Sequence, residues 1–161
     1  MPQEKVYTVL EAHRYFAVEA NQRVWTLLAK KNRTSEESDE MLHAAHTSYY
    51  HWLVAGNVTN QQRAEWLLYR VYSELELFKR AAYHARRCHD LTQRHPEFMQ
   101  DFDVAYSHEC MARTFAMNGD LENAKAKYDK AKDAANRISN EEDRKIFMGD
   151  FTSGKWFGLE K

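Results

Sequence analysis

The sequence predicts an all-α protein of about seven helices, on three observations. Its 161 residues include only 5 glycines and 2 prolines, fewer than the turns of a β-sheet protein need. Apolar residues recur at steps of three and four along most of the chain, which is the spacing of one helix face. Capping residues, glycine or proline interrupt this pattern where helices are expected to end. The 43% of hydrophobic residues suffice for one core, so residues 1–161 are expected to form a single helical-repeat domain.

The first hairpin of helices is expected within residues 1–56. The apolar period that begins at Val6 predicts a long helix closing near Lys30. Residues 32–38 are polar and supply hydroxyl groups that can cap a second helix. That helix is expected to end at Gly56, because glycine tolerates a positive φ.

The second hairpin is expected within residues 57–95. Thr59 or Asn60 can cap its first helix, and a short break is expected near Glu76. Its second helix must stop before Pro96, because proline has no N–H to donate and disfavours α geometry in the preceding residue.

The third hairpin is expected within residues 97–139. Its first helix is apolar on two sides, which predicts that neighbouring helices cover both flanks. Gly119 and Asp120 then form the clearest turn in the chain, with glycine ending one helix and aspartate capping the next. Residues 140–161 are expected to form a capping helix, over residues 140–148, and a tail.

The third hairpin also carries a motif. Its members are His108, Met111, Ala112, Phe115, Gly119, Asp120, Ala124, Tyr128 and Ala131. This pattern resembles the tetratricopeptide repeat, and a weaker copy follows the same spacing at Leu68, Tyr72, Ala81, Ala85 and Cys88. The resemblance covers residues 61–138, and the whole chain is similar to small bacterial proteins of this helical type. It departs from the repeat at His108, where the family has a large apolar residue, and its helices are longer than standard.

The resemblance implies a right-handed stack of antiparallel helical hairpins, with a concave face that grips peptides or partner proteins. In this family the first helix of each hairpin lines the groove. The residues carried over to these partner-binding positions are Arg63, Trp66, Arg70, Tyr106, Glu109 and Arg113. Arginine binds carboxylates through two parallel hydrogen bonds, so the expected partner is a protein or peptide with an acidic or C-terminal carboxylate segment. The alternative is that these charges form ion pairs on a solvated face.

Charge and composition exclude several other functions. The chain has 23 Lys+Arg against 24 Asp+Glu and no long basic run, so we expect no binding to nucleic acid or to an acidic membrane. No stretch matches the glycine-rich loops that hold nucleotide phosphates. We therefore expect a non-enzymatic adaptor or scaffold with no cofactor.

The first twenty residues contain no apolar run long enough for a signal peptide or a membrane span. Cys88 and Cys110 fit reduced thiols at apolar positions, where a thiol is normally inert. The expected location is therefore cytoplasmic. Trp156 and Phe157 in the tail can fold back over the last hairpin or pack into a second copy, which would give a homodimer.

One cluster supports a different class of function. Glu40, His43 and His46 are spaced three apart and share one arc of the second helix. Two imidazoles and a carboxylate at this spacing are typical of transition-metal ligands, and the alternative function is a small helical metal-binding protein or enzyme. The simpler interpretation is an exposed polar helix face.

Overall fold

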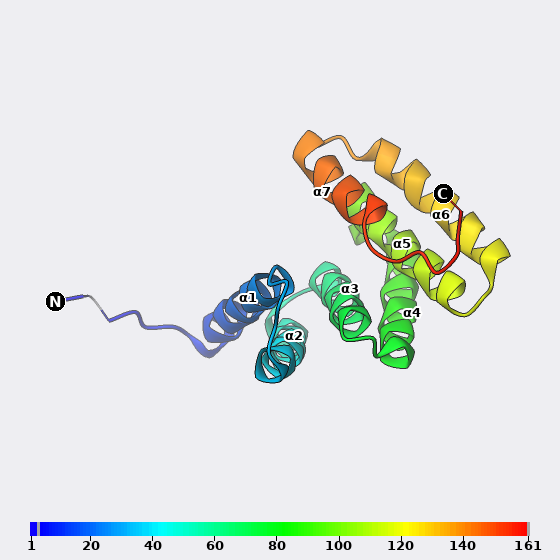
Figure 1. The fold of residues 1–161 in the computed structure, drawn as a ribbon. Coiled ribbons are helices and arrows are strands. Elements are labelled where there is room, and N and C mark those ends of the chain that lie inside the picture. The colour runs from blue at the N-terminus through cyan, green and yellow to red at the C-terminus, as the bar shows by residue number, and fades with distance from the viewer. Residues whose placement is uncertain (3, 161) are drawn as a thin grey trace.

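The computed structural model describes residues 1–2 and 4–160, and within them it contains seven α-helices, one short 3-10 helix and no strand. The helices are α1 (Val9–Leu28), α2 (Ser35–Ala55), α3 (Val58–Glu74), α4 (Phe78–Arg94), α5 (Asp101–Met117), α6 (Leu121–Arg137) and α7 (Glu141–Thr152), with the 3-10 helix η1 (Pro96–Phe98) before α5. Helices that follow one another pack together, most extensively α1 on α2, α3 on α4 and α5 on α6. Figure 1 shows these pairs arranged in chain order from α1 to α7. The all-α prediction is confirmed.

Reciprocal capping decides where the first helices begin. The Thr8 side chain accepts the N–H of Glu11, while the Glu11 carboxylate accepts the N–H of Thr8 at 2.8 Å, so α1 starts at Val9 rather than at Val6. Thr34 caps α2 in the same way, inside the polar segment that the sequence indicated.

The entry to α3 differs from the prediction. Asn57 caps this helix through its side chain, so neither Thr59 nor Asn60 is the N-cap. Gly56 has a φ of −103°, so a positive φ is not what this position requires. A Cβ at Gly56 would lie 2.8 Å from the carbonyl oxygen of Trp52, and close approach of the backbone explains the glycine instead.

The later helix boundaries follow the sequence more closely. Glu76 has a φ of 58° at the break between α3 and α4, and Gly119 has a φ of 79° before Asp120 caps α6. The expected end of the capping helix at residue 148 was wrong, because α7 continues through Gly149 to Thr152. The extra turn buries Phe151 against the rest of the core.

The core is centred on α5, which contacts α3, α4, α6 and α7. Ala105, Cys110 and Ala112 on this helix are completely buried, in agreement with the prediction of neighbours on both flanks. Cys88 on α4 is also completely buried, and burial raises the pKa of the Cys110 thiol. Both thiols are free and lie in the apolar interior, as expected.

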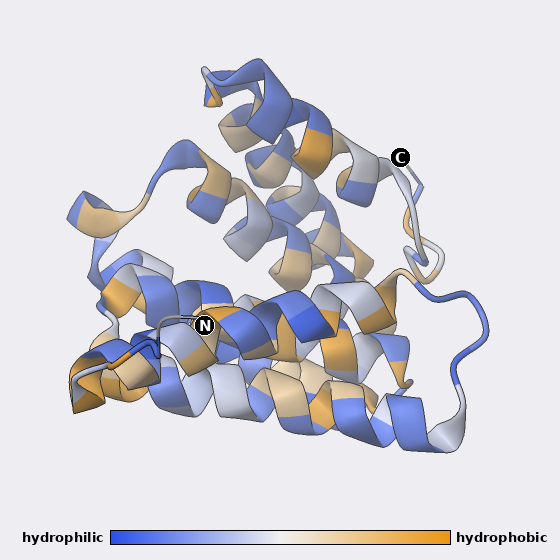
Figure 2. Cartoon of the chain, turned by 90° about the vertical axis from the view of Figure 1, so that its left-hand side faces the viewer, coloured by the Kyte–Doolittle hydropathy of each residue, from blue (hydrophilic) through white to orange (hydrophobic). Residues whose placement is uncertain are grey.

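Hydrophobic and hydrophilic positions alternate along the helices, as Figure 2 shows. The described part of the chain has no helix that is both long and apolar enough to cross a membrane. Most of the exposed large hydrophobic residues lie on the first two helices and the segment before them, where Tyr15, Phe16 and Tyr50 are at least 43% exposed.

Candidate functional site

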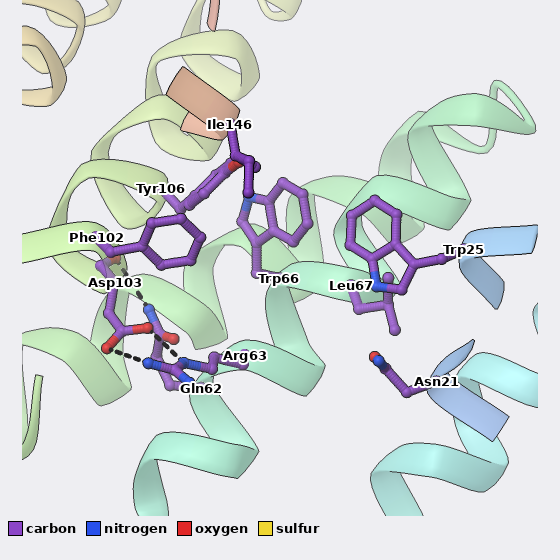
Figure 3. A pocket seen from close by; sticks show the side chains of 10 residues that line it. All are labelled: Asn21, Trp25, Gln62, Arg63, Trp66, Leu67, Phe102, Asp103, Tyr106 and Ile146. Carbon is purple, nitrogen blue, oxygen red and sulfur yellow. Dashed lines mark hydrogen bonds and ion pairs between the residues drawn. The ribbon is translucent and has the colours of Figure 1, made fainter. Parts of the chain in front are cut away.

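Side chains from α1, α3, α5 and α7 converge on one pocket of about 230 Å³, drawn in Figure 3. We call it the aromatic pocket. Its lining residues are Asn21, Trp25, Gln62, Arg63, Trp66, Leu67, Phe102, Asp103, Tyr106 and Ile146. Three of the six predicted groove residues, Arg63, Trp66 and Tyr106, therefore lie in one cavity.

Stacked rings form most of the pocket wall. The Trp66 ring lies 4.5 Å from the Tyr106 ring in an edge-to-face contact, and 6.1 Å from the Trp25 ring in a nearly parallel one. Trp66 is 8% exposed, whereas Trp25 is 42% exposed and stands at the opening. A buried tryptophan thus supports an accessible one, which keeps a rigid apolar surface open to solvent.

The polar edge of the pocket is an ion pair. Arg63 donates to both carboxylate oxygens of Asp103, at 2.7 and 3.2 Å, as the dashed lines in Figure 3 mark. Asp103 is 1% exposed and also accepts the N–H of Gln100. For Arg63, the ion-pair alternative is therefore the one observed, and this guanidinium is already neutralised before any ligand arrives.

Arg70 is different. Within the described part of the chain, its partly buried side chain makes no hydrogen bond or ion pair, and it lines a second pocket of about 350 Å³ that also includes Tyr69 and Arg113. Its positive charge opposes the rise in pKa that burial causes at Tyr106 and at Glu109. Arg70 is thus the predicted groove arginine that remains available to a carboxylate.

Glu109 and Arg113 form a buried ion pair beneath this second pocket. Arg113 Nε donates to Glu109 Oε1 at 2.5 Å, and Trp66 Nε1 donates to Glu109 Oε2 at 3.4 Å. Burial raises the pKa of the Glu109 carboxyl, and the nearby Arg113 guanidinium opposes that rise. The two residues are 4% and 8% exposed, so both are largely buried.

The C-terminal segment of the same chain covers Arg113 and accepts its hydrogen bonds. We call residues 153–160 the tail, which in Figure 1 runs back from α7 towards α5 and α6. Arg113 donates at 2.9 Å to each of three main-chain carbonyls, those of Asp150, Ser153 and Lys155. Its guanidinium also lies 4.0 Å from the centre of the Trp156 ring.

The same region anchors the last helix. Tyr106 Oη donates to Asp150 at 2.6 Å, and burial together with this hydrogen bond raises the pKa of Tyr106. Trp156 is 5% exposed and packs against Tyr128 and Phe151. The tail therefore folds back over the last hairpin, which was one of the two expectations for it. Formation of a homodimer through Trp156 stays a prediction.

Sequence reasoning missed part of the pocket. Trp25 and Ile146 come from helices outside the residues that carry the repeat motif, so the motif gave them no groove position. A signal for Trp25 exists in hindsight: it lies next to the buried Val24, so a large aromatic ring falls on the partly exposed side of α1.

The side chains of Glu40, His43 and His46, the alternative metal ligands, do not converge on one point. Glu40 accepts two hydrogen bonds from Arg23, at 2.5 and 2.9 Å, and Nε2 of His46 lies 2.8 Å from Tyr72 Oη. His43 is exposed. Across the described residues, no group of three or more His, Cys, Asp or Glu side chains is arranged to hold a metal ion.

A second polar cluster surrounds Glu65, which is completely buried on α3. Its carboxylate accepts hydrogen bonds from Tyr49 at 2.6 Å and Arg87 at 2.6 Å, and pairs with Nδ1 of His84 at 2.7 Å. Burial alone would raise the pKa of Glu65, but these hydrogen bonds outweigh it and lower the pKa below its usual value. Because the donors come from α2 and α4, this cluster ties three helices together.

Comparison with known proteins gives no relative. No protein-family model matches this chain, and no match was found among curated proteins or among solved structures.

Proposed function

We propose that this protein is a peptide-binding interaction module, an adaptor or scaffold, with its helices arranged as a tetratricopeptide-like stack. The observation that carries the proposal is the aromatic pocket, where an accessible tryptophan lies beside a buried one and four helices meet. Tryptophan, tyrosine and arginine are the residues most enriched among those that dominate binding at protein interfaces.

The size of the pocket favours a side chain of a partner over a whole metabolite. Its volume of about 230 Å³ lies below the range of roughly 300–1,000 Å³ typical of small-molecule sites. Leu67, Phe102 and Ile146 complete an apolar lining, so the side chain that fits is large and apolar. Binding of such a side chain is favoured mainly because its apolar surface is removed from water.

The charges favour a carboxylate beside that side chain. Arg63 is held by Asp103 and Arg113 by Glu109, so each of these arginines faces an acidic partner already. Arg70 lines the second pocket together with Gly154 and Lys155 of the tail and has no such partner in the described residues. A partner segment with a large apolar side chain next to an acidic residue or a free C-terminal carboxylate uses both features.

Binding should depend on Trp25 and Arg70. We expect that a peptide selected from a library of C-terminal sequences loses about thirtyfold in affinity on Trp25→Ala, as expected for loss of a dominant aromatic contact of about 2 kcal/mol. Arg70→Glu should weaken binding of the free-acid peptide more than that of the same peptide with an amidated end. Isothermal titration calorimetry measures both effects.

Two exposed substitutions serve as controls. Tyr50→Ala removes an exposed aromatic ring of α2 outside the pocket, and Arg86→Glu reverses an exposed charge on α4. Both variants should bind the peptide as the wild type does. If the library yields no peptide whose binding Trp25→Ala weakens, the aromatic pocket is not a peptide site.

A further inference from the structure

The tail is recognised largely through its main chain. Two of the three carbonyls that Arg113 binds belong to the tail, at Ser153 and Lys155, and both distances are 2.9 Å. Every residue has a main-chain carbonyl, so these two contacts require the backbone path of the tail, with its left-handed residue Gly154, rather than particular side chains. Only the ring of Trp156, stacked on the Arg113 guanidinium, supplies a side-chain requirement at this position.

The side chains that contact the tail are themselves fixed by contacts with the rest of the core. We define the Arg113 socket as Glu109, Arg113, Tyr128 and Phe151. Glu109 fixes Nε of Arg113 and is itself held by Trp66 Nε1, and none of these contacts involves the tail. The guanidinium therefore keeps its orientation without the tail, and a preorganised site loses less entropy on binding.

The tail adopts an unfavourable backbone to fit the socket. Phe157 has a φ of 52°, which is uncommon for a residue with a side chain, and Gly154 has a φ of 74°. A Cβ at Gly154 would lie 3.0 Å from Nη1 of Arg113. The Lys155 ion pair with Glu76 is more than 60% exposed at both side chains and adds little stability.

We propose that the Arg113 socket is a second peptide subsite, in which the tail is an exchangeable resident ligand that an aromatic-bearing segment of a partner protein replaces. This inference rests on the proposed function. The partner must supply an aromatic ring, because removing Trp156 would otherwise expose the apolar rings of Tyr128 and Phe151 to water.

A separate partner suits this exchange better than a second copy of the chain. Phe151 is buried in the core of its own chain. If Trp156 entered the socket of a second copy, the four residues 152–155 would have to bridge the two molecules. Four extended residues span at most about 14 Å. A segment of another protein carries no such tether.

The socket is linked to the aromatic pocket. Trp66 lines the pocket and donates to Glu109, which is the ion-pair partner of Arg113. Tyr106 lines the same pocket and donates to Asp150, whose carbonyl Arg113 binds. The aromatic pocket and the Arg113 socket are therefore joined by hydrogen bonds through the interior.

The exchange can be measured in the full-length chain. The probe is a fluorescein-labelled synthetic peptide with the sequence of residues 152–160, and binding is followed by fluorescence anisotropy. We expect Gly154→Ala to raise the affinity of the chain for this peptide about tenfold, because alanine strains the left-handed backbone of the resident tail. The same peptide with serine at the position of Trp156 should not bind.

Gly149→Ala is the matched control, because a Cβ at Gly149 meets nothing within 4 Å. Circular dichroism checks that both variants keep their helices. If Gly154→Ala fails to fold, Trp156→Ser loosens the resident tail instead, by removing the ring that lies on the Arg113 guanidinium, and should also raise the affinity for the peptide. Unchanged affinity in the folded variant would overturn the proposal.

Two further readouts separate this inference from the proposed function. In hydrogen exchange, adding unlabelled peptide to Gly154→Ala should speed the exchange of the chain's own tail amides, and no change would count against displacement. Trp25→Ala should leave binding of the tail peptide intact. Loss of tail-peptide binding in that variant would show that the peptide occupies the aromatic pocket rather than the socket. Concentration-independent sedimentation is expected, and dimers that form only in Gly154→Ala would favour exchange between copies.

Discussion

Glu65→Ala is expected to lower the free energy of unfolding by about 2–4 kcal/mol. The carboxylate is completely buried and accepts from Tyr49, pairs with His84 and forms an ion pair with Arg87, so its removal leaves these groups without an acceptor. Arg87 is 47% exposed and can turn to water, which places the loss below that of a fully buried charge. Urea denaturation followed by circular dichroism measures the change.

Asp129→Ala is the matched control for this prediction. Asp129 pairs with Lys125 on the surface of α6, where both side chains are more than half exposed. Its loss should change the stability by less than about 1 kcal/mol. A Glu65→Ala variant as stable as Asp129→Ala would mean that the cluster around Glu65 does not hold α2, α3 and α4 together.

The second large effect is a loss of stability in mild acid. His89 and His108 contact each other at a ring distance of 5.5 Å, and burial, aided by the Lys127 ammonium group, lowers the pKa of each to about 4. Lys130 lies on the same side and acts in the same direction. In the unfolded chain each imidazole titrates near the ordinary histidine pKa of about 6.5.

The sign of the effect follows from proton binding. Between about pH 6.5 and 4 the unfolded chain binds more protons than the folded one at these imidazoles, so stability falls as the pH falls. From pH 7 to pH 5 the expected loss is about 2 kcal/mol for each imidazole. Urea denaturation at a series of pH values measures the slope.

Substitution separates this effect from those of the carboxyl groups. Glu109 has a pKa raised by burial and therefore acts in the opposite direction, so the comparison is between the wild type and a double variant. His89→Gln combined with His108→Gln should reduce the slope between pH 7 and 5, and His46 and His51, whose pKa values burial also lowers, keep part of it. His43→Gln on the exposed face of α2 is the control variant. Equal slopes in all three chains would show that the two imidazoles bind the same number of protons in the folded and the unfolded chain.

Helix boundaries were predictable where a few neighbouring residues decide them. Gly119 and Asp120 end one helix and cap the next through contacts within the turn itself, and the prediction was right. Asn57 was missed as a cap because Thr59 and Asn60 are also good caps, and only the reciprocal pair with Asn60 selects it. The last turn of α7 forms because Phe151 packs in the core, which local propensity does not report.

For the candidate site, the sequence placed residues on a face but did not pair them. The resemblance to the tetratricopeptide repeat assigned Arg63, Trp66 and Tyr106 to one groove, and the three residues line one pocket. It did not show that Asp103, forty residues after Arg63, would neutralise that arginine, nor that the tail would cover Arg113. Such contacts join distant parts of the chain, and their geometry depends on how whole helices pack.

The short connection between α2 and α3 has a mechanical consequence. Trp25 on α1 faces Trp66 on α3, yet α1 packs chiefly on α2, so the opening of the pocket is set by the angle at which the first helix pair meets α3. That joint consists of Gly56 and Asn57, with the backbone pressed against Trp52 and the cap locked by Asn60. The distance between Trp25 and Trp66, and with it the width of the aromatic pocket, therefore depends on the backbone path through Gly56 and Asn57.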